Sequence, residues 1–327
     1  MKKVTVIGAG AWGTAIAKVL AENGAAVTLW VYEKDLAQAI QKERENGSYL
    51  HGVLLPDSIR VVSDLQEAMC DAEIIFEAIP VPHVRMVLNS LKPHFKKFQR
   101  FVVLSKGIEQ TTCFLPSEII QDVLGKDVDV AVVSGPSFAR ELAHMQMTGV
   151  VAASSDQALL HEVKDLLENR YLKLFFSHDM RAVQVCGALK NVVTLGVGML
   201  EGAGYKDNTK AFFMVQMVHE MQEVLAVFKC KDIHATLQGL AGMGDLVLTA
   251  FGRSSKNLSF GQLLGKGLSV EQAKEMVHCV PEGIATLSTI VELLEQKNKH
   301  LPLFIKLHKI IHQQISVATL LDVLVCD

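Results

Sequence analysis

Two lysines occupy positions at which an ammonium group could do chemistry. Lys106 follows the apolar run RFVVLS and precedes a glycine, and Lys190 lies within GALKN between apolar neighbours. A lysine in apolar surroundings must be paired, extend to the surface or have a functional role. Burial of Lys190, or a second cation such as Lys106 nearby, would weaken its hold on a proton and suit it to proton transfer. For Lys106, a solvated surface charge is the competing interpretation.

Two further segments have the composition of anion-binding loops. In SGPSFARE, Gly135, Pro136 and Ser137 form a constrained turn after an apolar strand, which can aim N–H groups and a hydroxyl at an anion. The other interpretation is that Ser137 caps a helix, and the two roles are compatible. The segment 239–261 carries Asp245 after a glycine-rich turn and then Ser255, Lys256 and Asn257. Donors and a cation in this order favour a phosphate site, and a solvated loop is the alternative.

The stretch GAGAWG at residues 8–13 lies between an apolar run and a helical segment. In a dinucleotide cradle Gly8 permits the tight turn, Gly10 lets the backbone approach the pyrophosphate, and Gly13 allows close helix packing. Such a cradle requires an acidic residue after the second strand, where Glu33 ends VTLWVYE. A plain strand-to-helix turn would not need Glu33. A carboxylate there favours NAD over NADP, although Lys34 could receive a phosphate.

The elements that would position these groups change in character along the chain. Before residue 180, short apolar runs alternate with helical segments, which predicts a mostly parallel, doubly wound α/β sheet. We expect seven strands, at residues 4–8, 26–31, 60–64, 73–79, 100–106, 129–135 and 149–155. Long helical segments follow without a clear strand. We therefore expect a Rossmann dinucleotide-binding domain at 1–180, an all-helical substrate and catalytic domain at 181–327, and a site between them.

Composition excludes several classes of protein. The 327 residues carry a net charge of −3 and 6% aromatic residues, which argues against a nucleic-acid partner. The six cysteines have no metal-ligand spacing, and the only histidine pair at helical spacing, His308 and His312, lacks a third ligand, so no metal site is expected. We expect no membrane partner either, because the apolar stretches look too short to span a bilayer. These features favour a cytoplasmic protein.

Taken together, the motifs resemble those of the NAD(P)-dependent sn-glycerol-3-phosphate dehydrogenase family, in its bacterial form. GAGAWG, SKGIE, SGPSFARE, GALKNVVTLGVGMLEGAGYKDNTKA, GLAGMGDLVLT, SKN and VPEG occur in the family's order, from the first strand almost to the C-terminus. The resemblance implies reversible hydride transfer between a nicotinamide, NAD or NADP, and C2 of dihydroxyacetone phosphate, giving sn-glycerol 3-phosphate for phospholipid synthesis. It implies a Rossmann domain followed by an all-α domain, and homodimers are common in the family.

The resemblance also implies roles for individual residues. Lys190 matches the general acid/base, and Lys106 matches a lysine that touches both substrate and cofactor. Catalytic roles therefore fall to Lys190, Lys106 and Asp245. Substrate contacts would come from Lys106, Gly135, Ser137, Lys190, Asp245, Ser255, Lys256 and Asn257. Cofactor contacts would come from Gly8, Gly10, Ala11, Trp12, Gly13, Tyr32, Glu33, Lys106, Ala139, Lys256, Val280 and Glu282.

Some positions depart from the family pattern. Bacterial members usually have Arg where Lys256 stands, so a planar bidentate group is replaced by a point charge. Tyr32 stands where a basic residue often accepts the NADP phosphate, which again favours NAD. Pro281 replaces a more usual aliphatic residue. Gln216-Met217 stands where Arg-Gly is common, and its effect on substrate affinity does not follow from the sequence.

Two other functions fit part of the pattern. A related two-domain dehydrogenase of the β-hydroxyacid or ketopantoate type would have the same first half, but would act on a carboxylate substrate without a phosphate. A non-catalytic NAD-binding sensor would bind NADH without turnover and would tolerate loss of Lys190.

Overall fold

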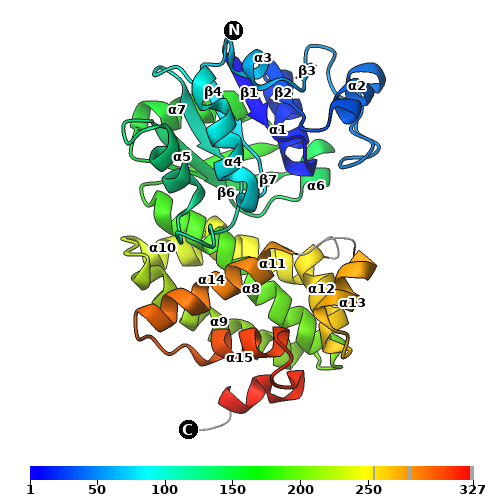
Figure 1. The fold of residues 1–327 in the computed structure, drawn as a ribbon, viewed down its shortest axis with the longest axis vertical. Coiled ribbons are helices and arrows are strands. Elements are labelled where there is room, and N and C mark those ends of the chain that lie inside the picture. The colour runs from blue at the N-terminus through cyan, green and yellow to red at the C-terminus, as the bar shows by residue number, and fades with distance from the viewer. Residues whose placement is uncertain (253–254, 278–280, 325–327) are drawn as a thin grey trace. The chain divides into compact units, whose positions relative to one another are not determined.

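The computed structural model describes residues 1–252, 255–277 and 281–324. It forms two compact units. The first comprises residues 1–106 and 114–180, and the second comprises residues 107–113 with the chain from Arg181 onward. The short segment Gly107–Cys113, which the sequence pattern places in the first domain, therefore packs with the second unit. Figure 1 shows the fold of both units and labels most of their helices and strands.

The first unit contains an eight-stranded sheet in the order β3-β2-β1-β4-β5-β6-β7-β8. Its strands are β1 (Lys3–Ile7), β2 (Ala26–Trp30), β3 (Arg60–Val62), β4 (Ile74–Glu77), β5 (Arg100–Val103), β6 (Val130–Ser134), β7 (Thr148–Ser154) and β8 (Leu172–Ser177). All neighbours are parallel except β6 and β7. The predicted doubly wound α/β class is confirmed.

Helices connect these strands on both faces of the sheet. They are α1 (Ala11–Glu22), α2 (Lys34–Glu43), α3 (Leu65–Met69), α4 (Val81–Leu91) with the 3-10 turn η1 (Lys92–His94), α5 (Pro116–Leu124), α6 (Ala139–Ala143) and α7 (Gln157–Leu167). Helix α1 leads from β1 to β2 on one side of β1 in the sheet, and α4 leads from β4 to β5 in the opposite direction. Because such crossovers are right-handed, α1 and α4 lie on opposite faces, and the reversal between β1 and β4 is where ligands bind in this class of sheet.

One strand, β8, was not among the predicted strands. Its sequence LKLFFS places Lys173 among the apolar residues, and the side chains of Phe175 and Phe176 are partly exposed. An edge strand has only one neighbour and one fully covered face, so it lacks the continuous apolar run that marks the central strands.

Among the residues that the structure describes, every regular element of the second unit is a helix, and the segment Gly107–Cys113 is irregular. The unit contains α8 (Met180–Gly202), α9 (Asp207–Val227), α10 (Ile233–Gln238), the π-helical turn η2 (Leu240–Gly244), α11 (Asp245–Phe251), α12 (Lys256–Gly265), α13 (Val270–Val277), α14 (Glu282–Gln296), α15 (Pro302–Ile311) and the 3-10 helix η3 (Val317–Leu324). The predicted helical second half is therefore confirmed.

The core of this unit is α8, whose 18-residue apolar window is entirely buried. By length and composition α8 could cross a membrane, so the expectation that every apolar stretch is too short was wrong. Its complete burial instead marks it as a core helix. Gly198 and Gly202 of α8 face Gly261 and Gly265 of α12, and a Cβ at any of these positions would come within 2.3 Å of a backbone oxygen of the other helix. The two helices thus cross with their backbones in direct contact.

A buried carboxylate joins α9 to α15. The two carboxylate oxygens of Glu220 accept hydrogen bonds from the backbone N–H groups of Leu303 (2.8 Å) and Phe304 (3.1 Å), at the first turn of α15. Burial raises the pKa of Glu220 above its ordinary value of 4.5, against the opposing effect of these two hydrogen bonds. The folded state therefore holds this proton more tightly than the unfolded chain does.

We expect this carboxyl group to make stability depend on pH. As pH rises from about 4.5 through the raised pKa, the folded protein binds more protons than the unfolded chain, so the free energy of unfolding must fall. Glu220→Gln should remove this contribution. Urea unfolding between pH 4.5 and 7 should show wild type losing stability relative to Glu220→Gln as pH rises. Glu223→Gln, an exposed position on the same helix, is the control. Parallel curves for wild type and Glu220→Gln would contradict the expectation.

Candidate active site

The glycine-rich turn between β1 and α1 is built for close backbone approach. Gly8 has φ +111°, and a Cβ there would lie 2.5 Å from the carbonyl oxygen of Ala78. A Cβ at Gly13 would lie 1.9 Å from the carbonyl oxygen of Gly8. At Gly10, by contrast, a Cβ would meet nothing within 4 Å. Gly8 and Gly13 are therefore required by the fold, whereas Gly10 leaves open space beside the helix terminus.

The start of α1 offers unsatisfied donors beside that space. Gly10 is its N-cap and has no side chain to accept from the first turn, and that turn contains no acidic residue. The N–H groups of this turn and the positive end of the helix dipole suit an anion. The indole N–H of Trp12 is buried and has no hydrogen-bond partner within the described chain. These observations fit a bound dinucleotide pyrophosphate.

A buried asparagine, which the sequence pattern did not single out, supports this turn. The Asn46 amide donates to the carbonyl oxygen of Ala9 (2.8 Å) and to Oγ1 of Thr14 (2.9 Å). Its side chain is fully buried. Asn46 thus fixes the backbone of the glycine-rich turn from a loop far along the chain.

The residues expected at the ribose lie just beyond β2. Glu33 is the N-cap of α2, makes no side-chain capping bond, and is exposed. Tyr32 is 69% exposed and its ring packs edge-on against Trp30. Lys34, the first residue of α2, is also exposed. The segment just after β2 therefore presents a carboxyl group, a phenol hydroxyl and an ammonium to solvent.

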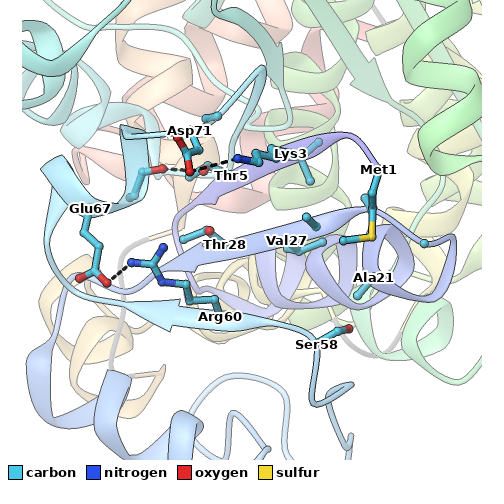
Figure 2. A pocket seen from close by; sticks show the side chains of 16 residues that line it. Met1, Lys3, Thr5, Ala21, Val27, Thr28, Ser58, Arg60, Glu67 and Asp71 are labelled. Carbon is cyan, nitrogen blue, oxygen red and sulfur yellow. Dashed lines mark hydrogen bonds and ion pairs between the residues drawn. The ribbon is translucent and has the colours of Figure 1, made fainter.

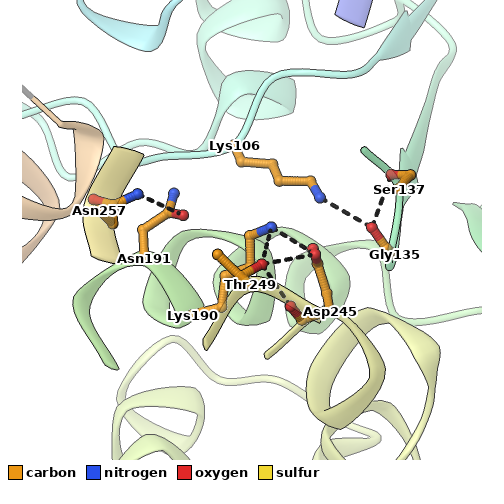
Figure 3. Close-up of polar contacts among 8 residues, drawn as sticks. All are labelled: Lys106, Gly135, Ser137, Lys190, Asn191, Asp245, Thr249 and Asn257. Atoms are coloured by element: carbon orange, nitrogen blue, oxygen red, sulfur yellow. Dashed lines mark hydrogen bonds and ion pairs between the residues drawn. The ribbon is translucent and has the colours of Figure 1, made fainter. Parts of the chain in front are cut away.

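The carboxyl ends of β5 and β6 bring three of the predicted residues together in the first unit (Figure 3). The Lys106 ammonium donates to the carbonyl oxygen of Gly135 at 3.2 Å, and the Ser137 hydroxyl donates to the same oxygen at 2.9 Å. The residue that caps α6 is Phe138, so the interpretation that Ser137 caps this helix was wrong. Ala139 begins α6.

The second unit holds Lys190 in a buried ion pair. Its ammonium donates to Oδ1 of Asp245 at 2.5 Å and to Oγ1 of Thr249 at 3.0 Å (Figure 3). Asp245 is 1% exposed and Lys190 is 8% exposed. Asp245 follows the π-helical turn η2, a distortion frequent at functional sites. Thr249, one helical turn after Asp245, was not predicted as a site residue.

A second buried set joins α8, α12 and α14. The Asn257 amide donates to Oδ1 of Asn191 (3.1 Å), and Oδ1 of Asn257 accepts from the backbone N–H of Gly283 (3.1 Å). A Cβ at Gly283 would lie 2.6 Å from Oδ1 of Asn257. The glycine of VPEG is therefore needed for this contact, and the sequence pattern did not indicate Asn191 as a participant.

The other predicted residues of the second unit differ in their burial. Ser255 is buried and caps α12 by accepting from the backbone N–H of Leu258 (3.2 Å). Lys256 and Glu282 are exposed at the first positions of α12 and α14. Val280 lies outside the described residues.

A separate cavity of about 360 Å³ lies at the opposite, amino-terminal edge of the sheet (Figure 2). Its lining includes the starts of β1, β2 and β3. Lys3 and Arg60 pair with Asp71 and Glu67, so these two basic groups are neutralised. Parallel sheets of this class bind ligands at their carboxyl edge. This cavity is therefore not the candidate active site.

No group of three or more potential metal ligands occurs among the residues that the structure describes. The Nε2 atoms of His308 and His312 lie 3.1 Å apart. Burial and the neighbouring His312 lower the pKa of His308.

Protein-family models match both halves of the chain. A protein-family model for the NAD-dependent glycerol-3-phosphate dehydrogenase N-terminus matches residues 3–160, and the model for the C-terminus of the same family matches residues 179–322. The chain belongs to the NAD-dependent glycerol-3-phosphate dehydrogenase family. The expected family is thus confirmed.

Individual relatives of this family align over nearly their full length. The glycerol-3-phosphate dehydrogenase [NAD(P)+] of Bacillus subtilis is 37% identical over 98% of this chain and 93% of its own length. The glycerol-3-phosphate dehydrogenase [NAD(P)+] of Bacillus cereus strain AH187 is 37% identical over 95% of this chain and 92% of its own length. The crystal structure of glycerol-3-phosphate dehydrogenase from Coxiella burnetii superposes with a TM-score of 0.94 at 30% identity, covering 100% of this chain and 99% of the other.

A protein of the ketopantoate type, the alternative considered above, is similar to this chain in fold. A ketopantoate reductase family protein from Ralstonia eutropha superposes with a TM-score of 0.62 at 17% identity, over 95% of this chain and 97% of that one. Its likeness therefore carries no conclusion about substrate.

Proposed function

We propose that this chain catalyses reversible hydride transfer between NAD(P) and C2 of dihydroxyacetone phosphate, forming sn-glycerol 3-phosphate. The observation that carries the proposal is the buried Lys190–Asp245 pair, in a chain that matches this family over residues 3–160 and 179–322. A buried ammonium fixed by a carboxylate and a hydroxyl is held in one orientation, as a proton donor in catalysis must be.

The first unit would bind the dinucleotide. Its pyrophosphate fits the space beside Gly10 and the free N–H groups at Ala11 and Trp12, which Gly8 and Gly13 allow to come close. Glu33 would accept from a ribose hydroxyl and Tyr32 would flank it, so we propose NAD as the preferred form. The remaining cofactor contacts in the proposal are Lys106, Ala139, Lys256, Val280 and Glu282. When bound, the reduced nicotinamide supplies the hydride.

Lys190 would act as the general acid/base. Addition of a hydride to a ketone builds negative charge on its oxygen, which a nearby ammonium stabilises and then protonates. Asp245 and Thr249 hold that ammonium, and Lys106 would contact both substrate and cofactor. In the reverse direction Lys190 takes the proton from the C2 hydroxyl.

The substrate phosphate needs cations and N–H donors. We propose that Ser255, Lys256 and Asn257 at the start of α12 supply them, with Gly135 and Ser137 in the first unit completing the substrate contacts. Lys256 is free to reach a ligand because its side chain is exposed. A lysine gives a point charge in place of the planar fork of an arginine, so the grip on phosphate is less directional.

We also propose the setting of this reaction. The division at residue 180 would separate a dinucleotide-binding domain from a substrate domain. A net charge of −3 and the burial of α8 support a cytoplasmic enzyme without nucleic-acid or membrane partners. A homodimer is supported by the family resemblance alone.

The deciding experiment follows the absorbance of NADH, and separately of NADPH, with dihydroxyacetone phosphate as substrate. We expect turnover with both cofactors and a higher kcat/KM with NADH. A higher value with NADPH would overturn the role given to Glu33 and Tyr32. Turnover with ketopantoate or another phosphate-free keto acid, but none with dihydroxyacetone phosphate, would assign the chain to a carboxylate substrate. Tight NADH binding without turnover of any of these substrates would indicate a sensor.

A further inference from the structure

A buried glutamate at the centre of the sheet has no role in the site as described so far. Glu77 is the last residue of β4, is 1% exposed, and is the only ionisable residue of that strand. It pairs in register with Ile7 of β1 on one side and Val103 of β5 on the other. Burying a carboxylate is costly unless hydrogen bonds satisfy it, so a glutamate here requires an explanation.

The position of Glu77 connects the two functional segments of the first unit. Ile7 immediately precedes the glycine-rich turn, and the carbonyl oxygen of Ala78, the next residue after Glu77, is what a Cβ at Gly8 would strike. On the other side, the backbone N–H of Leu104 donates to the carbonyl oxygen of Glu77 at 2.8 Å. The chain then continues through Ser105 to Lys106.

The carboxylate itself reaches the residue before Lys106. The Ser105 hydroxyl donates to Oε2 of Glu77 at 2.6 Å, and the backbone N–H of Ile79 donates to Oε1 at 2.7 Å. A separation of 2.6 Å lies at the short end of the range for O–H···O hydrogen bonds, so the two side chains hold each other closely. One oxygen is thus anchored to the turn after β4, and the other holds the turn after β5.

We propose that Glu77 is a positioning residue that acts through Ser105 to hold Lys106 in place. Lys106 follows Ser105 directly, and its ammonium reaches the carbonyl oxygen of Gly135. With the Ser105 side chain tied to the sheet, the backbone at Lys106 has little freedom to rotate. The inference deepens the proposed function, on which the role of Lys106 in binding substrate and cofactor rests.

Glu77→Gln tests the proposal with little change in volume. The amide oxygen can still accept from the backbone N–H of Ile79, but an amide NH2 group then faces the Ser105 hydroxyl, so the oxygen that accepts from this hydroxyl is lost. Because a misplacement of about 1 Å can cost about 10²-fold in rate, we expect kcat/KM for dihydroxyacetone phosphate to fall roughly 10- to 100-fold. Ser105→Ala cuts the same link from the other end and should give a similar loss. It also serves if Glu77→Gln does not fold.

A double-mutant cycle separates positioning from a general structural role. In a Lys106→Met background, Glu77→Gln and Ser105→Ala should cause no further loss of kcat/KM, since the group they position is absent. An equal loss in both backgrounds, or no loss in the Lys106-containing enzyme, would overturn the proposal. Circular dichroism and the thermal midpoint would establish that each variant is folded.

A second measurement does not depend on turnover. The rate of reductive methylation of Lys106, followed by mass spectrometry with exposed Lys97 as internal reference, reports how firmly the ammonium is held. We expect labelling several-fold faster in Glu77→Gln and Ser105→Ala than in wild type. Unchanged labelling would overturn the positioning role. If wild type does not turn over dihydroxyacetone phosphate, the proposed function fails, and the labelling rates still decide the role of Glu77.

Discussion

Replacing Lys190 by methionine is expected to lower kcat for dihydroxyacetone phosphate reduction by about 10²–10⁴-fold, the contribution typical of a positioned general acid. Methionine fills most of the volume of the lysine stem but has no proton to give. The single variant has a second effect, because it leaves the Asp245 carboxylate buried without its cation. Breaking a buried ion pair in this way costs about 3–5 kcal/mol, so loss of activity alone would not separate chemistry from folding.

The double variant Lys190→Met/Asp245→Asn resolves this ambiguity. It removes both charges and leaves Thr249 able to bond to the asparagine amide, so we expect it to be more stable than the single variant. It should bind NADH with near wild-type affinity in fluorescence titration and remain as inactive as the single variant. Turnover within about tenfold of wild type in the folded double variant would show that Lys190 is not the general acid/base.

Gly10→Ala is expected to leave the fold intact and weaken NADH binding at least about tenfold, which corresponds to 1.4 kcal/mol. A Cβ at Gly10 would meet nothing within 4 Å in the protein, and its φ of −66° suits any residue. The added methyl would instead occupy the space proposed for the pyrophosphate. Fluorescence titration with NADH and the thermal midpoint would measure the two effects separately.

Substitutions at two other glycines, Gly13 and Gly47, serve as controls for Gly10→Ala. Gly13→Ala would place its Cβ 1.9 Å from the Gly8 carbonyl oxygen, so it should lower the thermal midpoint strongly. Gly47→Ala, at a glycine with open space around it, should change neither stability nor affinity. If Gly10→Ala bound NADH as tightly as wild type, the turn would be a plain strand-to-helix connection and not a cradle.

The sequence alone predicts most of the fold because the fold follows from local patterns. The buried central strands β4 and β6 are apolar up to their last residue, and α14 has helical period over its whole length, so these elements were predicted. β8 was missed because an edge strand carries a weaker pattern. The apolar stretches were judged too short to span a bilayer, whereas α8 is long and apolar enough to do so. Only its burial inside the second unit, which the sequence does not reveal, marks it as a core helix.

The site was predictable only one residue at a time. Lys190 was identified as a lysine that must be paired, extend to the surface or have a functional role. Its partner, Asp245, lies 55 positions away, and local spacing does not reveal such a pairing. The sequence could have indicated Thr249, because it lies one helical turn after Asp245. The sequence could also have indicated Glu77, because it is the single ionisable residue in an otherwise apolar strand. Nothing in the sequence indicates Asn46, because its function depends on a loop folding back onto the glycine-rich turn.

The direct backbone contact between α8 and α12 restricts how this enzyme could acquire a new substrate. With Gly198 and Gly202 against Gly261 and Gly265, neither helix can slide or tilt without steric overlap, so Lys190 and Asn257 keep their spacing. A change of substrate that needed these helices to shift would therefore carry a steric penalty. What remains is exchange of individual side chains at the exposed start of α12, where Lys256 stands.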